Sequence, residues 1–323
     1  MPLTPKTRKY LIIFLILGWG TTLGYLALRG DKKETTKAQR LWRQNRLLMG
    51  TFWEVTSTDK DAADIVFSEA GRIEKLLSKY IPESEISQLN RKGKLEVSPD
   101  TFYIIKKAKE LWEKTGGAFD ITVAPLVDIW GFSEKEYRIP SEQLIKETLR
   151  LVGCDKIILH EKNNVVKFMF PGMKIDLGAI AKGFALDKAV AKLKKNNIRN
   201  CLINAGGQVY ALGEAPAGKW KVAIQDPRKQ EISRAVELKD ASISTSGDYE
   251  QFFFKNGRRY CHILNPKKGY PAESGIASVT VIDNSGLKAD ALSTAALILG
   301  REGLETLKNE FPEAEFLAIK ETQ

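Results

Sequence analysis

The stretch KADALSTAALILG, residues 288–300, combines an apolar helical pattern with a group of oxygen-bearing side chains. Asp290, Ser293 and Thr294 stand at i, i+3 and i+4, so a helix places all three on one side near its start. Oxygen ligands are those that a hard cation such as Mg²⁺ prefers, and a single carboxylate holds Mg²⁺ best with help from a bound phosphate. The pattern therefore predicts a cation that is completed by a bound diphosphate. The alternative is an N-capping Asp followed by small residues that pack closely.

A second stretch, KIDLGAIAKGFALDKAV at residues 174–190, brings a carboxylate and an ammonium group into helical spacing. Asp176, Ala179 and Lys182 follow one another at intervals of three, which directs them to one face at the start of a helix. Gly178 and Gly183 remove side-chain bulk beside them, and a helix N-terminus favours anions. This arrangement fits an anionic ligand. An Asp N-cap, a glycine turn and a solvated lysine explain the same residues without one.

Histidine is scarce, with only His160 and His262 in 323 residues. This scarcity excludes His-rich zinc or iron sites and leaves any metal to oxygen ligands. His262 lies in RYCHILNPKKGYP, residues 259–271, where a strand is expected to run into an Asn-Pro turn. It fits either a general base or a hydrogen-bonded strand residue. The three cysteines show no C-x-x-C spacing, so we expect buried thiols rather than zinc ligands or a disulfide framework.

The segment TGGAFDITVAPLVDIWGF, residues 115–132, is expected to form a loop between elements. Loops often line ligands, and Phe119 or Trp130 could flank a ring beside Asp120; core packing is the alternative. The chain contains no G-x-x-x-x-G-K-[ST], no G-x-G-x-x-G and no G-x-S-x-G motif. The commonest phosphate cradles and the serine-hydrolase elbow are therefore absent, and any nucleotide must be held in another way.

The positive charge of the chain is concentrated at its N-terminus. The formal net charge is +10, and residues 1–44 carry nine Lys and Arg against Asp31 and Glu34, which is +7 and leaves +3 for the remainder. The globular part thus lacks the broad basic footprint of a nucleic-acid-binding protein, and we expect no nucleic-acid partner. With 43% hydrophobic and 28% charged residues, it is long enough for a substantial core.

The N-terminal residues predict a signal or membrane-anchor segment. No charged residue occurs from 10 to 28, a run close to the ~20 apolar residues that span a bilayer. It fits an uncleaved anchor or a secretory signal. We therefore divide the chain into an anchor or signal at 1–30, a basic stalk at 31–44 and a globular domain at 45–323. More Lys and Arg follow the run than precede it; that count alone favours a cytoplasmic domain, although large domains translocate despite such charge.

After the stalk, the hydrophobic patterns indicate helices mixed with short strands. A strand is predicted at 47–57, and helices at 66–80 and 98–111. Ser98 followed by Pro99 predicts the start of the second helix. From residue 156 onward short β segments alternate with turns, and helices are expected at 178–195 and 289–299. The strands lie too close together for crossover helices. We therefore expect an α+β fold with mixed, largely antiparallel sheets and packed helices, preceded by an N-terminal hydrophobic helix.

Taken together and in this order, nine stretches resemble the ApbE family, the FAD:protein FMN transferases. They are MGTFWEV, SKYIPESEISQLNR, TGGAFDITVAPLVDIWGF, KIDLGAIAKGF, LINAGGQVYALG, WKVAIQDP, STSGDYEQFF, HILNPKKGYP and ADALSTAALILG. They extend from residue 49 to residue 300, nearly all of the expected globular part. Each stretch is weak alone, but nine in register make a specific signal.

The resemblance implies an exported, often membrane-tethered enzyme on the extracytoplasmic face of a bacterial membrane. Such an enzyme binds FAD and Mg²⁺ and moves FMN onto a Thr or Ser hydroxyl of an acceptor protein. By motif position, the resemblance implies FAD contacts at Met49, Tyr80, Ala118, Phe119, Asp120, Asp176, Lys182 and Ile263. It implies that the metal takes a backbone oxygen from Ala179 and side-chain oxygens from Asp290 and Thr294, with Ser293 nearby.

In this chemistry, the acceptor hydroxyl attacks the FMN-side phosphorus and AMP leaves, which requires charge neutralisation and in-line positioning. His262 is the candidate base for the hydroxyl proton, and an Asp near the metal is the alternative. Two rival functions stay open: an FAD pyrophosphatase, in which water replaces the acceptor, and a non-catalytic FAD-binding surface protein. Gln208 stands where the family often has an acid, and Cys261 where a Ser is common.

Overall fold

The computed structural model describes residues 40–229 and 231–320. The expected N-terminal hydrophobic helix and residues 31–39 of the expected stalk lie outside this part of the chain. Within the described residues, no helix has both the length and the apolar character that a membrane crossing requires.

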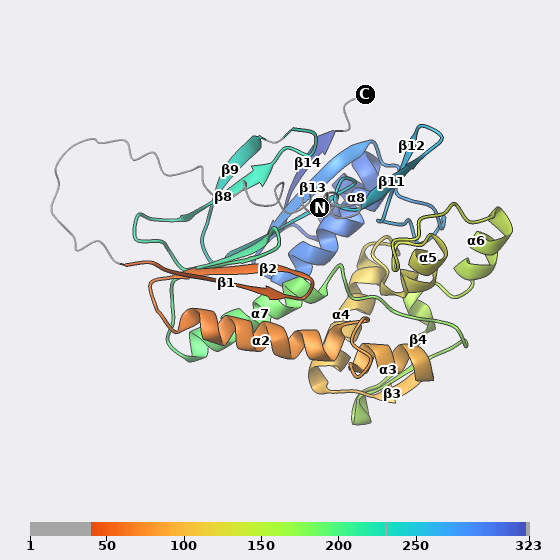
Figure 1. Ribbon diagram of the computed structural model, residues 1–323, viewed down its shortest axis with the longest axis horizontal. Coiled ribbons are helices and arrows are strands. Elements are labelled where there is room, and N and C mark those ends of the chain that lie inside the picture. Colours follow the sequence, from red (N-terminus) through yellow and green to blue (C-terminus); the bar gives the residue numbers. More distant parts are fainter. Residues whose placement is uncertain (1–39, 230, 321–323) are drawn as a thin grey trace, which may run out of the picture. The chain divides into compact units, whose positions relative to one another are not determined.

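A seven-stranded sheet organises the fold (Figure 1). Its strand order is β1-β2-β6-β7-β10-β13-β14, and every neighbouring pair is antiparallel. The strands are β1 (Trp42–Leu48), β2 (Thr51–Ser57), β6 (Cys201–Ala205), β7 (Gln208–Leu212), β10 (Ala241–Gly247), β13 (Ile276–Asp283) and β14 (Glu315–Lys320). The antiparallel α+β fold expected from the sequence is confirmed.

Three small antiparallel sheets accompany the main one. The first joins β3 (Lys94–Glu96), β5 (Val165–Phe168) and β4 (Ile157–His160). The other two are ribbons, one of β8 (Trp220–Gln225) with β9 (Ile232–Leu238), and one of β11 (Phe252–Lys255) with β12 (Arg258–Cys261). The two ribbons matter for function because β8 of the first lines the cavity described below, and the second is flanked by Gln251 and His262, which also line it.

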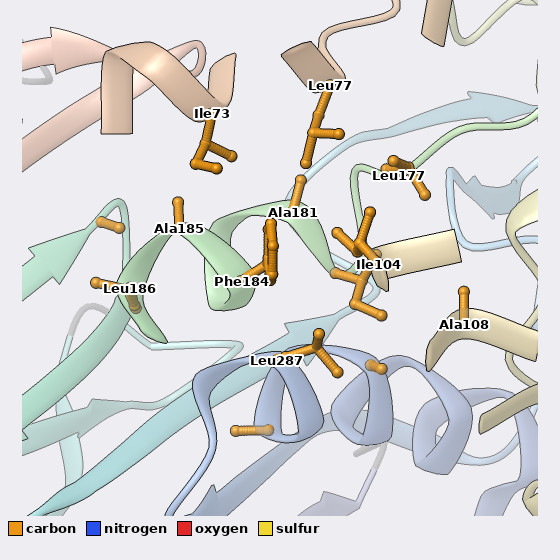
Figure 2. Close-up of a cluster of buried hydrophobic side chains, with 14 of the residues drawn as sticks. Ile73, Leu77, Ile104, Ala108, Leu177, Ala181, Phe184, Ala185, Leu186 and Leu287 are labelled. Carbon is orange, nitrogen blue, oxygen red and sulfur yellow. The ribbon is translucent and has the colours of Figure 1, made fainter. Parts of the chain in front are cut away.

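Three helices, α2 (Ala62–Leu77), α7 (Ala181–Lys195) and α8 (Gly286–Glu310), pack on one face of the main sheet. Figure 2 shows α7 between α2 and α8, with Phe184 of α7 among buried side chains such as Ile73 and Leu287. The β8–β9 ribbon covers the opposite face, where Trp220 and Ile224 pack in a second apolar cluster (Figure 1). Burial of these apolar surfaces supplies the main driving force for folding.

The remaining helices lie between residues 85 and 149. They are α3 (Glu85–Lys92), α4 (Pro99–Lys114), α5 (Ala124–Ile129) and α6 (Glu142–Leu149), with short 3₁₀ turns at Ile121–Val123, Cys154–Lys156 and Glu161–Asn163. Ser98 caps α4 by accepting a hydrogen bond from the Thr101 N–H, as the Ser-Pro sequence predicts.

The single strand predicted at 47–57 is wrong, because the chain turns back within it. Met49 and Gly50 adopt φ values of 50° and 72° and join β1 to β2 as a tight hairpin. Strand β1 also begins at Trp42, inside the segment expected to be stalk. Its residues WRQNRLL are exposed on both faces, because this edge strand is held by backbone pairing with β2. Its sequence therefore shows no alternation of apolar and polar residues from which a strand could be predicted.

Both predicted functional helices have different boundaries in the structure. Helix α7 begins at Ala181 rather than residue 178, and α8 begins at Gly286 rather than residue 289. The earlier start of α8 has a clear cause. The Asp187 carboxylate accepts the Gly286 and Leu287 N–H groups, and the N-cap residue Ser285 accepts the Lys288 N–H with its hydroxyl. Helix α8 extends to Glu310, with a non-helical break at Gly300.

Gly183 permits the close approach of α7 and α8. A Cβ at this position would lie 2.0 Å from the Gly286 carbonyl oxygen and 2.8 Å from Gln208 Nε2. We expect Gly183→Ala to lower the free energy of unfolding by about 2–3 kcal/mol. Gly71→Ala in α2 is the matched control, because its Cβ meets only Leu48 at 3.7 Å and should stabilise by about 0.5 kcal/mol. Urea denaturation of the two variants tests the contrast.

Candidate active site

A cavity of about 720 Å³ opens between the N-terminal ends of α7 and α8, strand β10 and the β8–β9 ribbon. Eleven of the thirteen predicted site residues line it. They are Tyr80, Ala118, Phe119, Asp120, Asp176, Ala179, Lys182, His262, Ile263, Asp290 and Thr294. Its volume is in the range of pockets that enclose a cofactor-sized ligand.

Met49 and Ser293 are the two predicted residues that the structure does not bring to the cavity. Met49 packs against the main core, and its N–H donates to Glu74 Oε1 over 2.8 Å. Ser293 is fully buried; its hydroxyl donates to the Asp290 carbonyl oxygen and lies 2.8 Å from Ser246 Oγ. Trp130, considered above as a ring contact, instead packs in a separate apolar cluster and donates its Nε1–H to the Gly269 carbonyl.

Asp290 is the buried carboxylate at the inner end of the cavity. Its Oδ2 accepts the Gly183 N–H over 3.0 Å, and Ser244 Oγ lies 3.5 Å from its Oδ1. Burial raises the pKa of Asp290, and the nearby Lys182 charge and the Gly183 hydrogen bond only partly oppose this. A bound cation would relieve the cost of an ionised carboxylate at this position.

Strand β10 contributes hydroxyl groups that sequence reasoning missed. Ser244 and Ser246 lie two apart, so both face α8; Ser246 Oγ is 3.1 Å from Thr294 Oγ1. The stretch STSGDYEQFF was recognised as a family block, but none of its residues was assigned a role. The alternation of Ser242, Ser244 and Ser246 in ASISTSG was the available signal, because period two in a strand puts them on one face.

The oxygen atoms at the inner end fit a hard cation. Among residues 40–229 and 231–320, no cluster of three His, Cys, Asp or Glu side chains could hold a metal, so Asp290 needs neutral oxygens and a ligand beside it. Gln208 lines the cavity near Gly183, is 2% exposed, and its Oε1 is buried without a hydrogen-bond partner. The Thr294 hydroxyl also lines the cavity. These donors are those that Mg²⁺ takes when a phosphate completes its shell.

Asp176 and Lys182 both reach the cavity, although not by the predicted helical stacking. Asp176 and Ala179 precede α7, and only Lys182 lies within it. Asp176 forms an ion pair of 2.8 Å with Lys79, and its Oδ1 accepts the Gly178 N–H. Burial opposes a charge on Lys79, but the attraction and hydrogen bond of Asp176 outweigh it and raise the pKa of Lys79.

Lys182 is the cation best placed for an anionic ligand. It is half-buried, lines the cavity, and forms no hydrogen bond or ion pair within the described part of the chain. Its charge acts on Asp290, His262 and Glu250. Glu250 was also missed by sequence reasoning. Its side chain is exposed as a whole, but desolvation by the surrounding protein raises its pKa, and Lys182 opposes that shift. An anion bound here would neutralise Lys182.

His262 follows β12, and one nitrogen of its ring is hydrogen-bonded to a backbone carbonyl of the same chain. Its Nδ1 lies 3.1 Å from the Gln251 carbonyl oxygen, which also accepts the His262 backbone N–H. A carbonyl only accepts, so Nδ1 carries the proton of the neutral ring and Nε2 keeps a lone pair. Nε2 has no hydrogen-bond partner among the described residues. Burial lowers the pKa of His262, which keeps the ring in its basic form at neutral pH.

The loop at residues 118–120 forms the wall near α4. Phe119 is 2% exposed and packs with the core, while Tyr80 is 71% exposed at the rim. Asp120 caps the turn at Ile121–Val123 by accepting the Thr122 N–H over 2.7 Å, and burial raises its pKa. Cys154 donates its thiol to the same carboxylate over 3.3 Å. Asp120 therefore holds the loop in shape as well as bordering the cavity.

These features define an α+β protein with one cavity that combines a buried carboxylate and hydroxyl groups, a lysine without a partner among the described residues, and a neutral imidazole. The model of the ApbE family matches residues 49–318. The chain belongs to this family.

Relatives and solved structures agree with that assignment. The FAD:protein FMN transferase of Haemophilus influenzae is 32% identical over 261 residues, covering 77% of this chain and 75% of the relative. That of Buchnera aphidicola is 33% identical over 286 residues, covering 84% and 81%. The ApbE protein of Thermotoga maritima has a TM-score of 0.81 at 33% identity, covering 87% of this chain and 94% of that one. The flavin transferase ApbE of Vibrio cholerae has a TM-score of 0.79 at 29% identity, covering 88% and 94%.

Proposed function

We propose that this chain is an FAD:protein FMN transferase, which moves FMN from FAD to a Thr or Ser hydroxyl of an acceptor protein and releases AMP. The observation that carries the proposal is the meeting of three groups in one cavity: the Asp290 carboxylate, the Lys182 ammonium and the His262 ring. FAD joins a ring system to a diphosphate, and the transfer needs a charge-neutralising end and a base beside it. The names of the relatives support the same reaction.

Mg²⁺ is the proposed metal, and the donor set fits it. The Asp290 carboxylate and the Thr294 hydroxyl would hold it, together with a backbone oxygen of Ala179. When bound, the ion supplies positive charge against the diphosphate and the departing AMP. Gln208 Oε1, buried without a partner, is available to a water of the hydration shell.

The protein's own groups have separate tasks in the transfer. Lys182 lies against the diphosphate and offsets its charge, which also orients the flavin-side phosphorus toward the acceptor. His262 Nε2 takes the proton of the acceptor hydroxyl as its oxygen bonds to that phosphorus. The bond between this phosphorus and the bridging oxygen breaks, and AMP leaves with the electron pair. The Gln251 carbonyl keeps the ring in the required tautomer.

We also propose that the chain works on the extracytoplasmic face of a bacterial membrane, held there by the N-terminal apolar segment. The support for membrane association is the uncharged run at 10–28 with basic residues before it. The support for the side is the resemblance to the exported enzymes of the ApbE family, because the count of flanking Lys and Arg alone favours the opposite side. Cell fractionation of the full chain tests the membrane association. Digestion of the domain by protease added to spheroplasts or protoplasts tests the side.

Ser293 and Thr294 allow a paired test of the metal site. Thr294→Val keeps the side-chain volume but removes a cavity hydroxyl, and we expect it to weaken Mn²⁺ or Mg²⁺ binding by about tenfold or more. Ser293→Ala removes only the buried hydrogen bonds to Ser246 and the Asp290 carbonyl, so we expect an unfolding loss of about 1–2 kcal/mol with metal affinity within about twofold. Isothermal titration with MnCl₂ separates the two; equal affinities would remove Thr294 from the site.

The reaction itself is tested by mass spectrometry. The full chain is incubated with FAD, Mg²⁺ and proteins of its own membrane fraction, and tryptic peptides are searched for an added FMN mass on Thr or Ser. Parallel chromatography measures free FMN and AMP. AMP with a modified protein supports transfer, equal amounts of free FMN and AMP identify a pyrophosphatase, and bound FAD without either product identifies a binding protein.

A further inference from the structure

Strand β8 has one edge without a partner, and this edge borders the cavity. It pairs only with β9, in a two-stranded ribbon. Four consecutive residues of β8, 222–225, line the cavity. Successive side chains of a strand point to opposite sides, so four in a row border a cavity only when the strand presents its edge. We call residues 221–225 along this side the β8 edge.

The hydrogen-bond pattern identifies which backbone groups the β8 edge presents. Just beyond β8, the Asp226 N–H donates to the Glu231 carbonyl over 2.9 Å, toward β9. The pairing register shifts by one residue between Ile224 and Gln225, but the extra residue lies in β9, so the alternation of N–H groups continues along β8. The N–H groups of Val222 and Ile224 therefore also face β9, and those of Lys221, Ala223 and Gln225 face the cavity side. No strand of the described chain pairs with them.

The β8 edge is held firmly in place. Trp220 and Ile224 are buried against the main sheet, and Trp220 Nε1–H donates to the Leu212 carbonyl over 3.1 Å. Beyond the strand, the Arg228 guanidinium forms two hydrogen bonds to Asp248, of 2.7 and 2.6 Å. Ala223 is exposed and small, so little covers the backbone there. An edge that is fixed, open and free of a bulky side chain is ready to pair with another chain.

We propose that the β8 edge docks an extended segment of the acceptor protein, which adds to the ribbon as a third strand. This inference rests on the proposed transferase activity, because such an enzyme must bring a Thr or Ser of another protein into the cavity. The β8 edge and His262 line the same cavity, so a segment paired along the edge brings its hydroxyl into the cavity that the His262 ring borders. Strand addition supplies affinity through main-chain hydrogen bonds and leaves the alternate side chains of the added segment free to enter the cavity.

The first test uses peptides rather than protein variants. A pool of synthetic ten-residue peptides, each with one central Thr and random flanks, is incubated with the full chain, FAD and Mg²⁺, and the fastest-modified peptide is resynthesised with a methyl group on one backbone nitrogen at a time. We expect methylation to raise KM by about fivefold or more at every second position, and to have little effect between. A rise without period two, or modification of whole proteins but of no peptide, overturns strand addition.

The second test uses a matched pair of proline variants. Ala223 and Ala235 are cross-strand partners in β8 and β9, and both are exposed. By the same alternation, the Ala235 N–H faces the far edge of the ribbon, away from β8. Ala223→Pro and Ala235→Pro each remove one outward N–H from the same ribbon at the same level.

We expect Ala223→Pro to raise the peptide KM about tenfold with FAD affinity unchanged, and Ala235→Pro to stay within about twofold of wild type. Equal KM values in the two variants overturn the proposal, and so does a loss of FAD affinity in Ala223→Pro, which would assign the edge to FAD. If Ala223→Pro fails to fold, the methylated peptides decide alone. A wild-type chain that binds FAD but modifies neither peptide nor protein removes the proposed function itself, which is a separate result.

Discussion

Asp290→Asn is expected to abolish FMN transfer, by about 10³-fold or more, while the metal-free protein stays at least as stable as the wild type. The cation would lose its one carboxylate ligand, and several kcal/mol of charge stabilisation in the reaction would go with it. The Asn amide oxygen can still accept the Gly183 N–H that Oδ2 accepts now. The fold therefore keeps its hydrogen bond and loses only a buried charge.

The sign of the stability change follows from the raised pKa of Asp290. Below the ordinary value of 3.8 the carboxyl is protonated in both folded and unfolded chains, so the variant and the wild type should match. As pH rises through and above that value, the unfolded chain ionises more readily than the buried group, and the wild type loses stability. The advantage of Asn should thus be present at neutral pH and vanish in strong acid.

Thermal unfolding with and without MnCl₂ measures both parts of this prediction. Mn²⁺ should raise the melting temperature of the wild type and leave that of Asp290→Asn unchanged. Asp187→Asn is the matched control, since Asp187 is half-buried and also has a raised pKa, but it caps α8 and does not line the cavity. It should lower stability yet keep the response to Mn²⁺. Full transfer by Asp290→Asn with metal added would refute the metal assignment.

The sequence predicted the parts of this molecule that depend on local patterns. The antiparallel fold followed from short strands with little room between them, and the Ser98 cap of α4 followed from Ser-Pro. Asp290 and Thr294 line one cavity because i and i+4 share a helix face wherever the helix begins. Strand β1 escaped because an edge strand exposed on both faces has no alternation.

The missed cavity residues depend on contacts between distant elements. Ser246 gains its role only because β10 packs on α8, and the Gln208 amide is buried only because Gly183 lets α7 and α8 approach. Ser293 illustrates the opposite error. Its spacing put it beside the cation, but it lies about 100° of helical rotation before Thr294, and its hydroxyl contacts Ser246 and the Asp290 carbonyl instead of lining the cavity. Helical spacing fixes a face to within about a quarter turn, which is coarser than a ligand shell requires.

His262→Ala is expected to slow FMN transfer by about 10²- to 10³-fold while FAD still binds within about twofold of the wild-type affinity. The ring donates from Nδ1 to the Gln251 carbonyl, so the unprotonated Nε2 is the atom lost to the reaction. The residues proposed to contact FAD are other residues of the cavity, so loss of the ring should leave FAD binding largely intact. His160→Ala is the control, since His160 is exposed at the end of strand β4 and does not line the cavity.

The pH dependence of transfer distinguishes a base from a residue that only shapes the cavity. Burial lowers the pKa of His262 below 6.5; the Gln251 carbonyl opposes this, Lys182 adds to it and Asp176 opposes it. The basic form therefore prevails above that lowered pKa, and the wild-type rate should rise with pH on the acid side and level off before neutrality. His262→Ala should lack this rise, whereas His160→Ala should keep it. If His262→Ala retains this rise of the rate with pH, another group is the base. Glu250 lines the same cavity and has a raised pKa, so it would be the next residue to substitute.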